Sequence, residues 1–241
     1  MESADSSVRA GTARRWTITI ILAIAMVVAA VLGIVLLPGV TGDRPPFDPA
    51  AVPGTQVVWV TAPVGADHGT LQLWQRNRLR HWERTFTVPA WVGTEGISKE
   101  AKEGSSYTPE GTFALTEGFG RLPDVDAKLP YLSVDSSNTW WWISDTKSPL
   151  YNQKYQCVEA DCPFDTTLSE NLGRTEPQYN YALVIDYNRF PVVPKKGSAF
   201  FVHVEAGKPT AGCVAVADEV MRTLLTTLQP SRKPVIGMYS T

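Results

Sequence analysis

A histidine and a cysteine lie ten positions apart near the carboxyl end of the chain, within the segment Phe200 to Val216. His203 ends a run of alternating apolar residues, a turn-rich loop follows, and Cys213 opens the next β-like run. If the two runs pair as antiparallel neighbours, the loop can bring the imidazole and the thiol within hydrogen-bond reach. A free cysteine is only a few per cent thiolate at neutral pH, and an adjacent histidine that takes the thiol proton makes it a nucleophile. The pair therefore predicts acyl transfer, with Cys213 as nucleophile and His203 as its base.

Gly212 stands directly before the cysteine. Because glycine has no Cβ, backbone N–H groups of Gly212 and Cys213 can point at a developing oxyanion. Taken alone, a cysteine and a histidine at this spacing are a weak signal, since a buried structural cysteine with a hydrogen-bonded histidine is the usual arrangement. The rest of the chain must decide between these two interpretations.

The other two cysteines, Cys157 and Cys162, lie close together. A local disulfide between them would contribute about 2 kcal/mol on the chain-entropy account, so its use would be to shape a surface loop. The alternatives are two free thiols, a zinc site, for which histidines and further cysteines are few, and a redox pair with a spacing wider than C-x-x-C. If the two pair, Cys213 is left over, and an unpaired cysteine in an oxidising compartment is either buried and inert or needed for its reactivity.

Three segments together resemble the L,D-transpeptidase (YkuD-type) catalytic domain. His203 followed by Thr210-Ala211-Gly212-Cys213 is similar to the family's histidine, loop and Ser/Thr-x-Gly-Cys signature. Upstream, Lys102 to Leu115 resembles the family's strand with the pattern T-P-x-G-x-F-x-L, and Tyr181 to Asn188 resembles the strand that leads to the histidine. The resemblance covers Gln56 to Met238, nearly all of the chain after its N-terminal apolar segment.

The resemblance implies that Cys213 attacks the diaminopimelyl carbonyl of a peptidoglycan tetrapeptide stem, expels D-Ala and holds a thioester. An amine from a neighbouring stem would then attack, giving a 3→3 cross-link for cell-wall construction and cell shape. His203 would act as base and acid, the amides of Gly212 and Cys213 would form the oxyanion hole, and no metal or cofactor is required. Thr210 and Ala211 would line the substrate site, with the Thr210 hydroxyl bracing the loop or touching substrate.

The chain departs from the family pattern at three places. Ala211 stands where many members have a second histidine, Ala215 replaces an asparagine or arginine, and the loop from His203 to Cys213 is shorter. Two alternatives therefore stand beside the transpeptidase. One is an L,D-carboxypeptidase, in which water is the acceptor, and the other is a catalytically silent peptidoglycan-binding module of the same fold.

The elements that must position these residues are mostly short β-like runs separated by Gly, Pro, Asn and Asp. One convincing helix, Asp218 to Leu228, has apolar residues at helical spacing and should pack one face on a sheet. The prediction is a mainly β fold, sandwich- or barrel-like, with one amphipathic C-terminal helix. The predicted strands are Gln56 to Thr61, Thr70 to Trp74, Leu79 to Val88, Gly111 to Leu115, Thr139 to Ser144, Tyr181 to Tyr187, Ser198 to Val204 and Pro234 to Met238.

The stretch from Asp124 to Gln178 is the least regular part of the sequence. A long irregular insertion with aromatic residues is often a substrate lid. It holds the triplet Trp140-Trp141-Trp142, and alternate tryptophans of a strand would equally fill a core. Both interpretations remain open at this point.

The N-terminus differs from the remainder of the chain. Arg9, Arg14 and Arg15 precede an uncharged apolar run at 16–37, which as a helix rises about 33 Å and can cross a bilayer. The alternatives are a cleaved signal peptide and a buried helix. The arginines place residues 1–15 in the cytoplasm, with the signal anchor at 16–37, a Pro/Gly-rich linker at 38–54 and the catalytic domain at 55–241 outside the cell membrane.

The overall composition is that of one globular domain on a short anchor, with 44% hydrophobic and 19% charged residues. The net charge of −2 provides no basic stripe, which excludes nucleic acid as an expected partner. We expect the partners to be peptidoglycan stem peptides and, through the N-terminal helix, the membrane, and we expect the protein to act as a monomer.

Overall fold

The computed structural model describes residues 44–134, 137 and 139–241. The predicted cytoplasmic tail and signal anchor, and the linker as far as residue 43, lie outside the described residues. Within the described ranges, no helix has the length and apolar character needed to cross a membrane.

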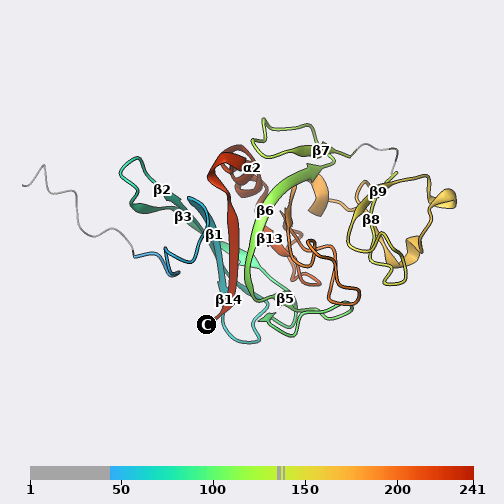
Figure 1. Cartoon of the computed structure of the whole chain (residues 1–241), viewed down its shortest axis with the longest axis horizontal. Helices are drawn as coiled ribbons and strands as arrows, with labels where there is room; N and C mark the ends of the chain where they lie inside the picture. The colour runs from blue at the N-terminus through green and yellow to red at the C-terminus, as the bar shows by residue number, and fades with distance from the viewer. Residues whose placement is uncertain (1–43, 135–136, 138) are drawn as a thin grey trace, which may run out of the picture. The chain divides into compact units, whose positions relative to one another are not determined.

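The main sheet of the described body has nine strands, in the order β11-β12-β13-β3-β2-β1-β14-β6-β7. A further pairing joins β11 to β6, so that the sheet curls back on itself in a barrel-like manner. Figure 1 shows β1, β14 and β6 side by side, with α2 above them. The strands are β1 (Gln56–Ala62), β2 (His68–Arg76), β3 (Trp82–Trp91), β6 (Gly111–Gly120), β7 (Tyr131–Ser133), β11 (Ala182–Ile185), β12 (Phe201–Val204), β13 (Val214–Val216) and β14 (Val235–Ser240).

The first strand shows why these sequences form a sheet with two buried faces. Val58 and Val60 belong to the largest apolar cluster, whereas Val57 and Trp59 belong to a second cluster on the opposite face. Successive side chains of a strand point to opposite faces, so an unbroken apolar run is buried on both sides. Phe47, from the predicted linker, caps the second cluster, with its ring centroid 5.4 Å from that of Trp59.

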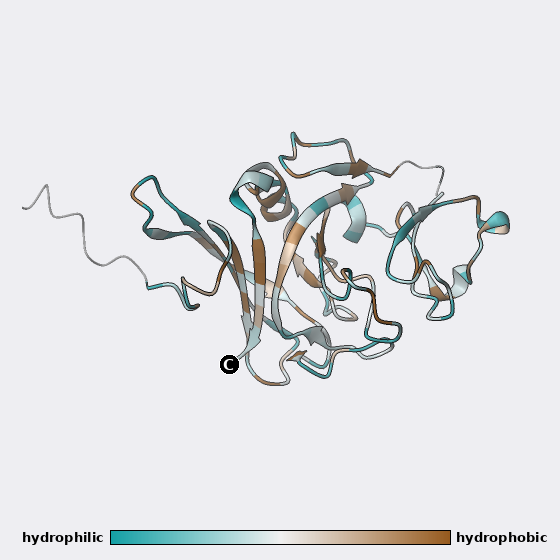
Figure 2. Cartoon of the chain, viewed as in Figure 1, coloured by the Kyte–Doolittle hydropathy of each residue, from teal (hydrophilic) through white to brown (hydrophobic). Residues whose placement is uncertain are grey.

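The helix α2 (Asp218–Thr227) covers the largest cluster. Met221, Leu224 and Leu225 are buried at helical spacing, and Asp218 lies in the first turn, where a negative charge is favourable. Figure 2 shows the coil hydrophilic on one side and hydrophobic on the other. The predicted amphipathic C-terminal helix is confirmed, and it ends one residue earlier than expected, at Thr227.

Each of the eight predicted strands corresponds to a strand of the structure, with boundaries that shift by a few residues. The direction of one pairing differs from expectation, because β12 and β13 are parallel rather than antiparallel. The loop between them is held against the segment after β3 by two backbone hydrogen bonds. The Thr210 carbonyl accepts from the Thr94 N–H at 3.0 Å, and the Thr210 N–H donates to the Val92 carbonyl at 3.0 Å. The chain must cross to this point before it re-enters the sheet, so it returns in the same direction.

The insertion carries a small sheet of its own, in the order β10-β8-β9. Its strands are β8 (Trp140–Trp142), β9 (Lys154–Gln156) and β10 (Glu170–Asn171). Trp142 belongs to an apolar cluster with Trp140 packed against it, so alternate tryptophans of the triplet do fill a core, while Trp141 is buried elsewhere, with its ring near that of Phe164. In Figure 1 the segment of β8 and β9 lies to the right, far from the β2–β3 hairpin.

Two short strands and four 3-10 helices complete the described elements. The strands are β4 (Ile97–Ser98) and β5 (Thr108–Pro109), which pair in parallel. The 3-10 helices are η1 (Glu159–Asp161), η2 (Thr166–Leu168), η3 (Gln178–Asn180) and η4 (Pro230–Arg232).

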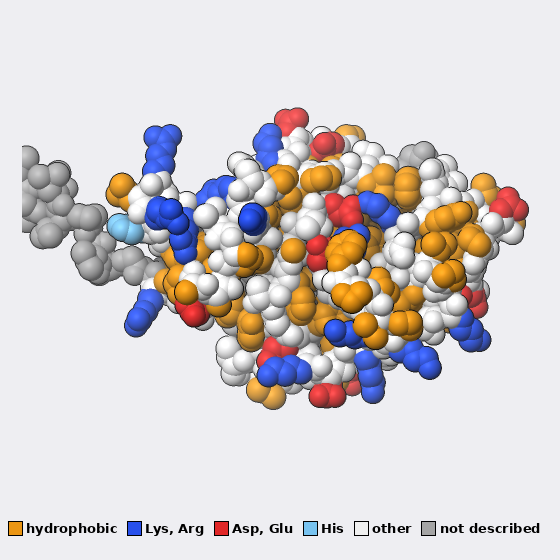
Figure 3. All heavy atoms as spheres, in the orientation of Figure 1, with side chains coloured by type: hydrophobic (Ala, Val, Ile, Leu, Met, Phe, Trp, Pro, Cys, Tyr) orange, Lys and Arg blue, Asp and Glu red, His pale blue; other side chains and the backbone are white. Residues whose placement is uncertain are grey.

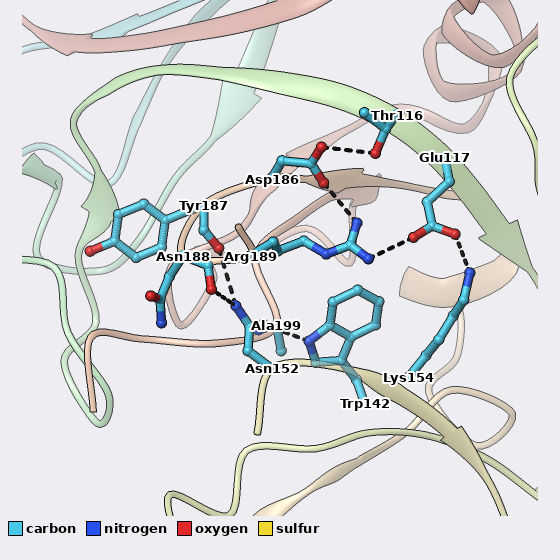
Figure 4. A network of polar contacts seen from close by, with 10 residues as sticks. All are labelled: Thr116, Glu117, Trp142, Asn152, Lys154, Asp186, Tyr187, Asn188, Arg189 and Ala199. Carbon is cyan, nitrogen blue, oxygen red and sulfur yellow. Dashed lines mark hydrogen bonds and ion pairs between the residues drawn. The ribbon is translucent and has the colours of Figure 1, made fainter. Parts of the chain in front are cut away.

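A buried polar network joins the insertion to the main sheet, as Figure 4 shows. Arg189, which follows β11, pairs with Asp186 at 2.7 Å and with Glu117 of β6 at 2.9 Å. Its guanidinium lies over the ring of Trp142, 5.2 Å from the centroid. Lys154 of β9 reaches the same Glu117. The insertion is therefore fixed to β6 and to the segment that follows β11.

Candidate active site

Phe201 and His203 of β12 share one sheet face with Cys213 and Ala215, at the start of β13. The parallel register sets His203 opposite Ala215 and Val202 opposite Val214, so Cys213 lies opposite Phe201. The alternate residues, such as Val202 and Val214, turn into the largest core cluster. His203 and Cys213 are thus diagonal neighbours on the same face.

The thiol of Cys213 is partly buried and held by backbone groups of the preceding strand. Its Sγ accepts from the Phe201 N–H at 3.4 Å and donates to the Ala199 carbonyl at 3.4 Å. A donor aimed at sulfur favours a negative charge there. Burial nevertheless raises the pKa of Cys213, and the negative charge of Glu170 raises it further. The resting site therefore holds a protonated thiol.

His203 is buried, with 7% of its surface exposed. Its Nδ1 lies 2.8 Å from the carbonyl oxygen of Val204. Because a carbonyl only accepts, Nδ1 carries the hydrogen, and Nε2 of the neutral ring keeps its lone pair. Burial lowers the pKa of His203, and the bond to Val204 opposes this shift. The residue is therefore a neutral imidazole ready to accept a proton at Nε2.

Cys213 and His203 line the same cavity, which has a volume of about 280 Å³. Cys213 also borders a second cavity of about 250 Å³. The first also contains Glu170, Thr175, Gln178, Tyr179, Ala206, Lys208, Pro209, Thr210 and Ala211. The second contains Lys102, Glu103, Gly104, Ser105, Ser106, Ser144, Glu170, Ser198, Ala199, Phe200, Ala211 and Gly212. Cys213 thus borders both cavities, and His203 borders the first.

The loop before the cysteine is braced by two threonine hydroxyls. Thr210 Oγ1 donates to the Cys213 carbonyl at 2.6 Å and accepts from the Gly212 N–H at 3.0 Å. Thr108 Oγ1, which is fully buried, donates to the Gly212 carbonyl at 2.8 Å and accepts from the Gly93 N–H at 2.8 Å. Thr210 therefore braces the loop. The Gly212 amide is engaged inside it in this conformation, and the oxyanion-hole role of Gly212 and Cys213 stays a prediction.

The bracing role of Thr108 was not predicted from the sequence. The residue lies in the T-P-x-G-x-F-x-L resemblance, which marks a strand but does not say what the hydroxyl holds. It is more than a hundred positions from the loop that it supports. The sequence signal for Thr108 was its place in this motif. Its hydrogen-bond partner, the Gly212 carbonyl, is brought to it only by the fold.

Two side chains of the site come from the insertion and its boundary, and sequence reasoning missed both. Tyr179 of η3 is buried, with its ring centroid 5.9 Å from that of His203. Its hydroxyl donates to Oε2 of Glu170, on β10. Burial raises the pKa of Glu170 to about 7, against the effect of the Tyr179 hydrogen bond and together with the charge of Glu103. The insertion therefore contributes an ionisable group next to the thiol.

Cys157 and Cys162 form a disulfide at the far end of the insertion, with their Cα atoms 5.4 Å apart. Cys213 is a free thiol. In the described part of the chain, no group of three or more His, Cys, Asp or Glu side chains is placed to hold a metal ion.

Comparisons with known proteins give one family match and two similar solved structures. Residues 65–236 match the sequence profile of the L,D-transpeptidase catalytic domain (YkuD), which is more than half of the chain. No curated protein matches the chain. Two solved structures are similar, both of the helical cell shape determining protein Pgp2 from Campylobacter jejuni, one of them a point mutant. Each has 12% identity and a TM-score of 0.43, over 78% of this chain and about half, 48%, of the Pgp2 chain.

Proposed function

Because this chain belongs to the L,D-transpeptidase catalytic domain (YkuD) family, we propose that it is a cysteine acyltransferase that makes 3→3 cross-links in peptidoglycan. The observation that carries the proposal is the pair of Cys213 and His203 on one sheet face and in one cavity. The thiol is unpaired, and the imidazole presents a lone pair. These are the two groups that thiol acyl transfer requires.

In the first half-reaction, His203 Nε2 takes the proton of Cys213 as Sγ attacks the carbonyl of the diaminopimelyl residue. Because the thiol and the imidazole are both neutral before substrate binds, the proton moves from Cys213 to His203 during the attack and not before it. The Phe201 N–H, already directed at Sγ, stabilises the developing thiolate. The imidazolium then gives its proton to the departing D-Ala amine, leaving a thioester on Cys213.

In the second half-reaction, an acceptor attacks the thioester carbonyl and Cys213 leaves. An amine from a neighbouring stem gives a cross-link, and water gives a tripeptide, the L,D-carboxypeptidase outcome. The two cavities that Cys213 borders support a route in which the donor acyl group and the acceptor occupy different cavities.

The decisive experiment is incubation of the purified full-length chain with tetrapeptide muropeptides, followed by mass analysis. We expect 3→3 dimers, together with released D-Ala, and neither product with Cys213→Ala. Tripeptides alone would identify a carboxypeptidase.

A second measurement separates a silent peptidoglycan-binding module from an enzyme whose acceptor is missing from the assay. The family resemblance implies that a carbapenem acylates the nucleophile, so intact-mass analysis should show one adduct that Cys213→Ala abolishes. A folded protein that forms no adduct and no product would be the silent module. Near-ultraviolet circular dichroism of both proteins checks that they are folded.

We also propose that residues 16–37 anchor the protein in the cell membrane, with residues 55–241 on the outer side. The arginines before the apolar run support this orientation. The disulfide supports an oxidising compartment for the domain. Protease treatment of intact spheroplasts should digest the domain, and protection until lysis would overturn this arrangement.

A further inference from the structure

The two cavities beside Cys213 share three lining residues, and one of them is a carboxylic acid. Glu170, Ala211 and Cys213 border both cavities. Glu170 thus lines both of the cavities that Cys213 borders. The charge of Glu170 also acts on the thiol, because it contributes to the raised pKa of Cys213.

The carboxyl group is oriented by the side chains around it. Tyr179 donates its hydroxyl hydrogen to Oε2, and the Tyr179 ring is fixed edge-on against His203 and Phe201. Among the described residues this hydrogen bond goes to Oε2, which leaves Oε1 for a substrate group. The backbone of Glu170 is held by its pairing with Trp142. A carboxylate fixed in this way is a ready acceptor of a proton or of an ammonium hydrogen bond.

The surroundings of Glu170 set when it is ionised. The ionisable groups that face it in the two cavities are Tyr179, His203, Cys213 and Lys208 in the first, and Glu103 and Lys102 in the second. Burial, with the charge of Glu103, raises its pKa to about 7. Near neutral pH, a substantial share of the molecules therefore has an ionised Glu170, and the group can both give and take a proton.

We propose that Glu170 is the base for the acyl acceptor: it binds the ammonium group of a primary amine beside the Cys213 thioester and removes its proton before attack. This assignment rests on the function proposed above and deepens it, because it names a second base for the reaction and the residue that binds the amine acceptor. The acceptor is an alkylammonium ion, for which an anionic partner at the meeting point of two cavities is complementary.

Transfer of the acyl group from Cys213 to the amine releases two of the three hydrogens on the ammonium nitrogen. The ammonium ion brings three hydrogens, of which one passes to Glu170 and yields the neutral amine. The amine nitrogen attacks the thioester carbonyl, the C–N bond forms, and the C–S bond breaks with its electron pair on sulfur. A second hydrogen passes through His203 to that thiolate, and the third stays on the new amide. His203 alone cannot hold both departing protons, since its neutral ring has one free lone pair.

The test is the variant Glu170→Gln, which keeps the size and hydrogen-bonding capacity of the side chain but cannot take a proton at neutral pH. The assay measures carbapenem acylation of Cys213 and the ratio of 3→3 dimers to tripeptides. We expect acylation to persist, since the variant removes a charge that raises the pKa of Cys213. We expect the dimer-to-tripeptide ratio to fall about 10²-fold, which is within the range for a lost general base. Glu159→Gln, in the same insertion but outside both cavities, is the matched control.

A pH profile distinguishes a base from a structural support. The dimer-forming rate of the wild-type protein should show an inflection at about pH 7, where Glu170 ionises, and Glu170→Gln should lose it. Tyr179→Phe removes a hydrogen bond that lowers the pKa of Glu170, so it should shift the inflection to higher pH. If Glu170 had only a structural role, the inflection would stay at the same pH in both variants.

Each outcome has a defined meaning. An unchanged product ratio and pH profile in Glu170→Gln, with acylation intact, overturns this assignment and leaves the acyltransferase in place. A wild-type protein that acylates but yields tripeptides alone overturns the assignment too, because its acceptor is then water. A wild-type protein that never acylates at Cys213 overturns the proposed function itself.

Discussion

The carbonyl oxygen of Val204 decides which nitrogen of His203 can act as a base. It accepts the Nδ1 hydrogen at 2.8 Å, so the tautomer is fixed by the backbone of the residue that follows. A backbone carbonyl cannot move away without breaking the strand. The orientation of the imidazole therefore depends on β12 itself and not on a third side chain.

The depressed pKa of His203 leads to a prediction about stability. The unfolded chain binds a proton at His203 near pH 6.5, whereas the folded chain binds it only at lower pH. As the pH falls below about 6.5, the unfolded state therefore holds more protons, and this residue's contribution to stability is lost. We expect the urea midpoint of His203→Gln to fall less than that of the wild type between about pH 7.5 and pH 5.5. Equal slopes for the two proteins would contradict this.

Gly212 is the residue whose replacement should be the least tolerated in the loop. Its φ is +142°, and a Cβ there would lie 2.9 Å from the carbonyl oxygen of Tyr107 and 2.6 Å from the ring of Phe200. We expect Gly212→Ala to lower the free energy of unfolding by about 1–3 kcal/mol through strain, and to reduce acylation of Cys213.

The control for that variant is Gly207→Ala, in the same loop. Gly207 also has a positive φ, +67°, but a Cβ there meets nothing within 4 Å. It should cost only about 1 kcal/mol and leave acylation unchanged. Equal losses in the two variants, by urea denaturation and adduct kinetics, would show that backbone conformation alone matters at these positions.

At the level of elements, the attachment of the insertion determines where Glu170 lies. Arg189 bridges Asp186 and Glu117 with 12% of its side chain exposed, and it covers the ring of Trp142. Removal of one partner of such a buried pair leaves charges without compensation, at a cost of about 3–5 kcal/mol. We expect Arg189→Met to lose stability in this range and to increase amide exchange in β8 and β10 more than in β1.

An exposed ion pair in the same insertion provides the control. Arg174 pairs with Glu159 at 2.8 Å, but both side chains are about half exposed. Arg174→Met should change the free energy of unfolding by no more than about 1 kcal/mol, because solvent screens the pair. An Arg189 variant that is no worse than the Arg174 variant would mean that the network in Figure 4 does not hold the insertion in place.

Elements that depend on neighbouring residues could be predicted from the sequence, and those that depend on distant contacts could not. Eight of the strands and α2 were found from the sequence because apolar alternation and helical spacing are properties of neighbouring residues, whereas the short strands β4, β5, β7, β9 and β10 were not predicted. The direction of β13 was not, because it depends on bonds between Thr210 and the distant Val92 and Thr94. Glu170 was missed for a similar reason: one glutamate in an irregular segment has no pattern, and its importance arises from the fold that brings it to Cys213.

At the scale of the whole molecule, the described body has apolar clusters on both faces of its sheet. On the face in Figure 3, Lys and Arg side chains are distributed among acidic and hydrophobic ones. The cluster around Trp59 and Trp82 is completed by Phe47, whose ring is 5.1 Å from that of Trp82. Residues before β1 thus contribute to the packing of the body.

Phe47 therefore gives a prediction about the whole fold. Phe47→Ala should lower the free energy of unfolding by about 3 kcal/mol, as for other buried phenylalanines, measured by urea denaturation. A fragment that begins at residue 44 should likewise be more stable than one that begins at residue 55. Val64→Ala, at a side chain that is 80% exposed, is the control and should stay within about 0.5 kcal/mol of the wild type. A loss at Phe47 no larger than that would contradict the packing role.

In β12 and β13, side chains with odd and even residue numbers point to opposite faces of the sheet and have different roles. Of the odd positions, 203 and 213 line the active-site cavity and 201 fills a separate apolar cluster, whereas the even positions 202, 204, 214 and 216 face the main core. Substitutions at positions 203 and 213 should therefore change turnover more than melting temperature, and those at position 201 and at the even positions should chiefly lower the melting temperature. A shift of one residue in either strand would exchange the two sets, so the segment can tolerate changes of side chain far better than changes of length.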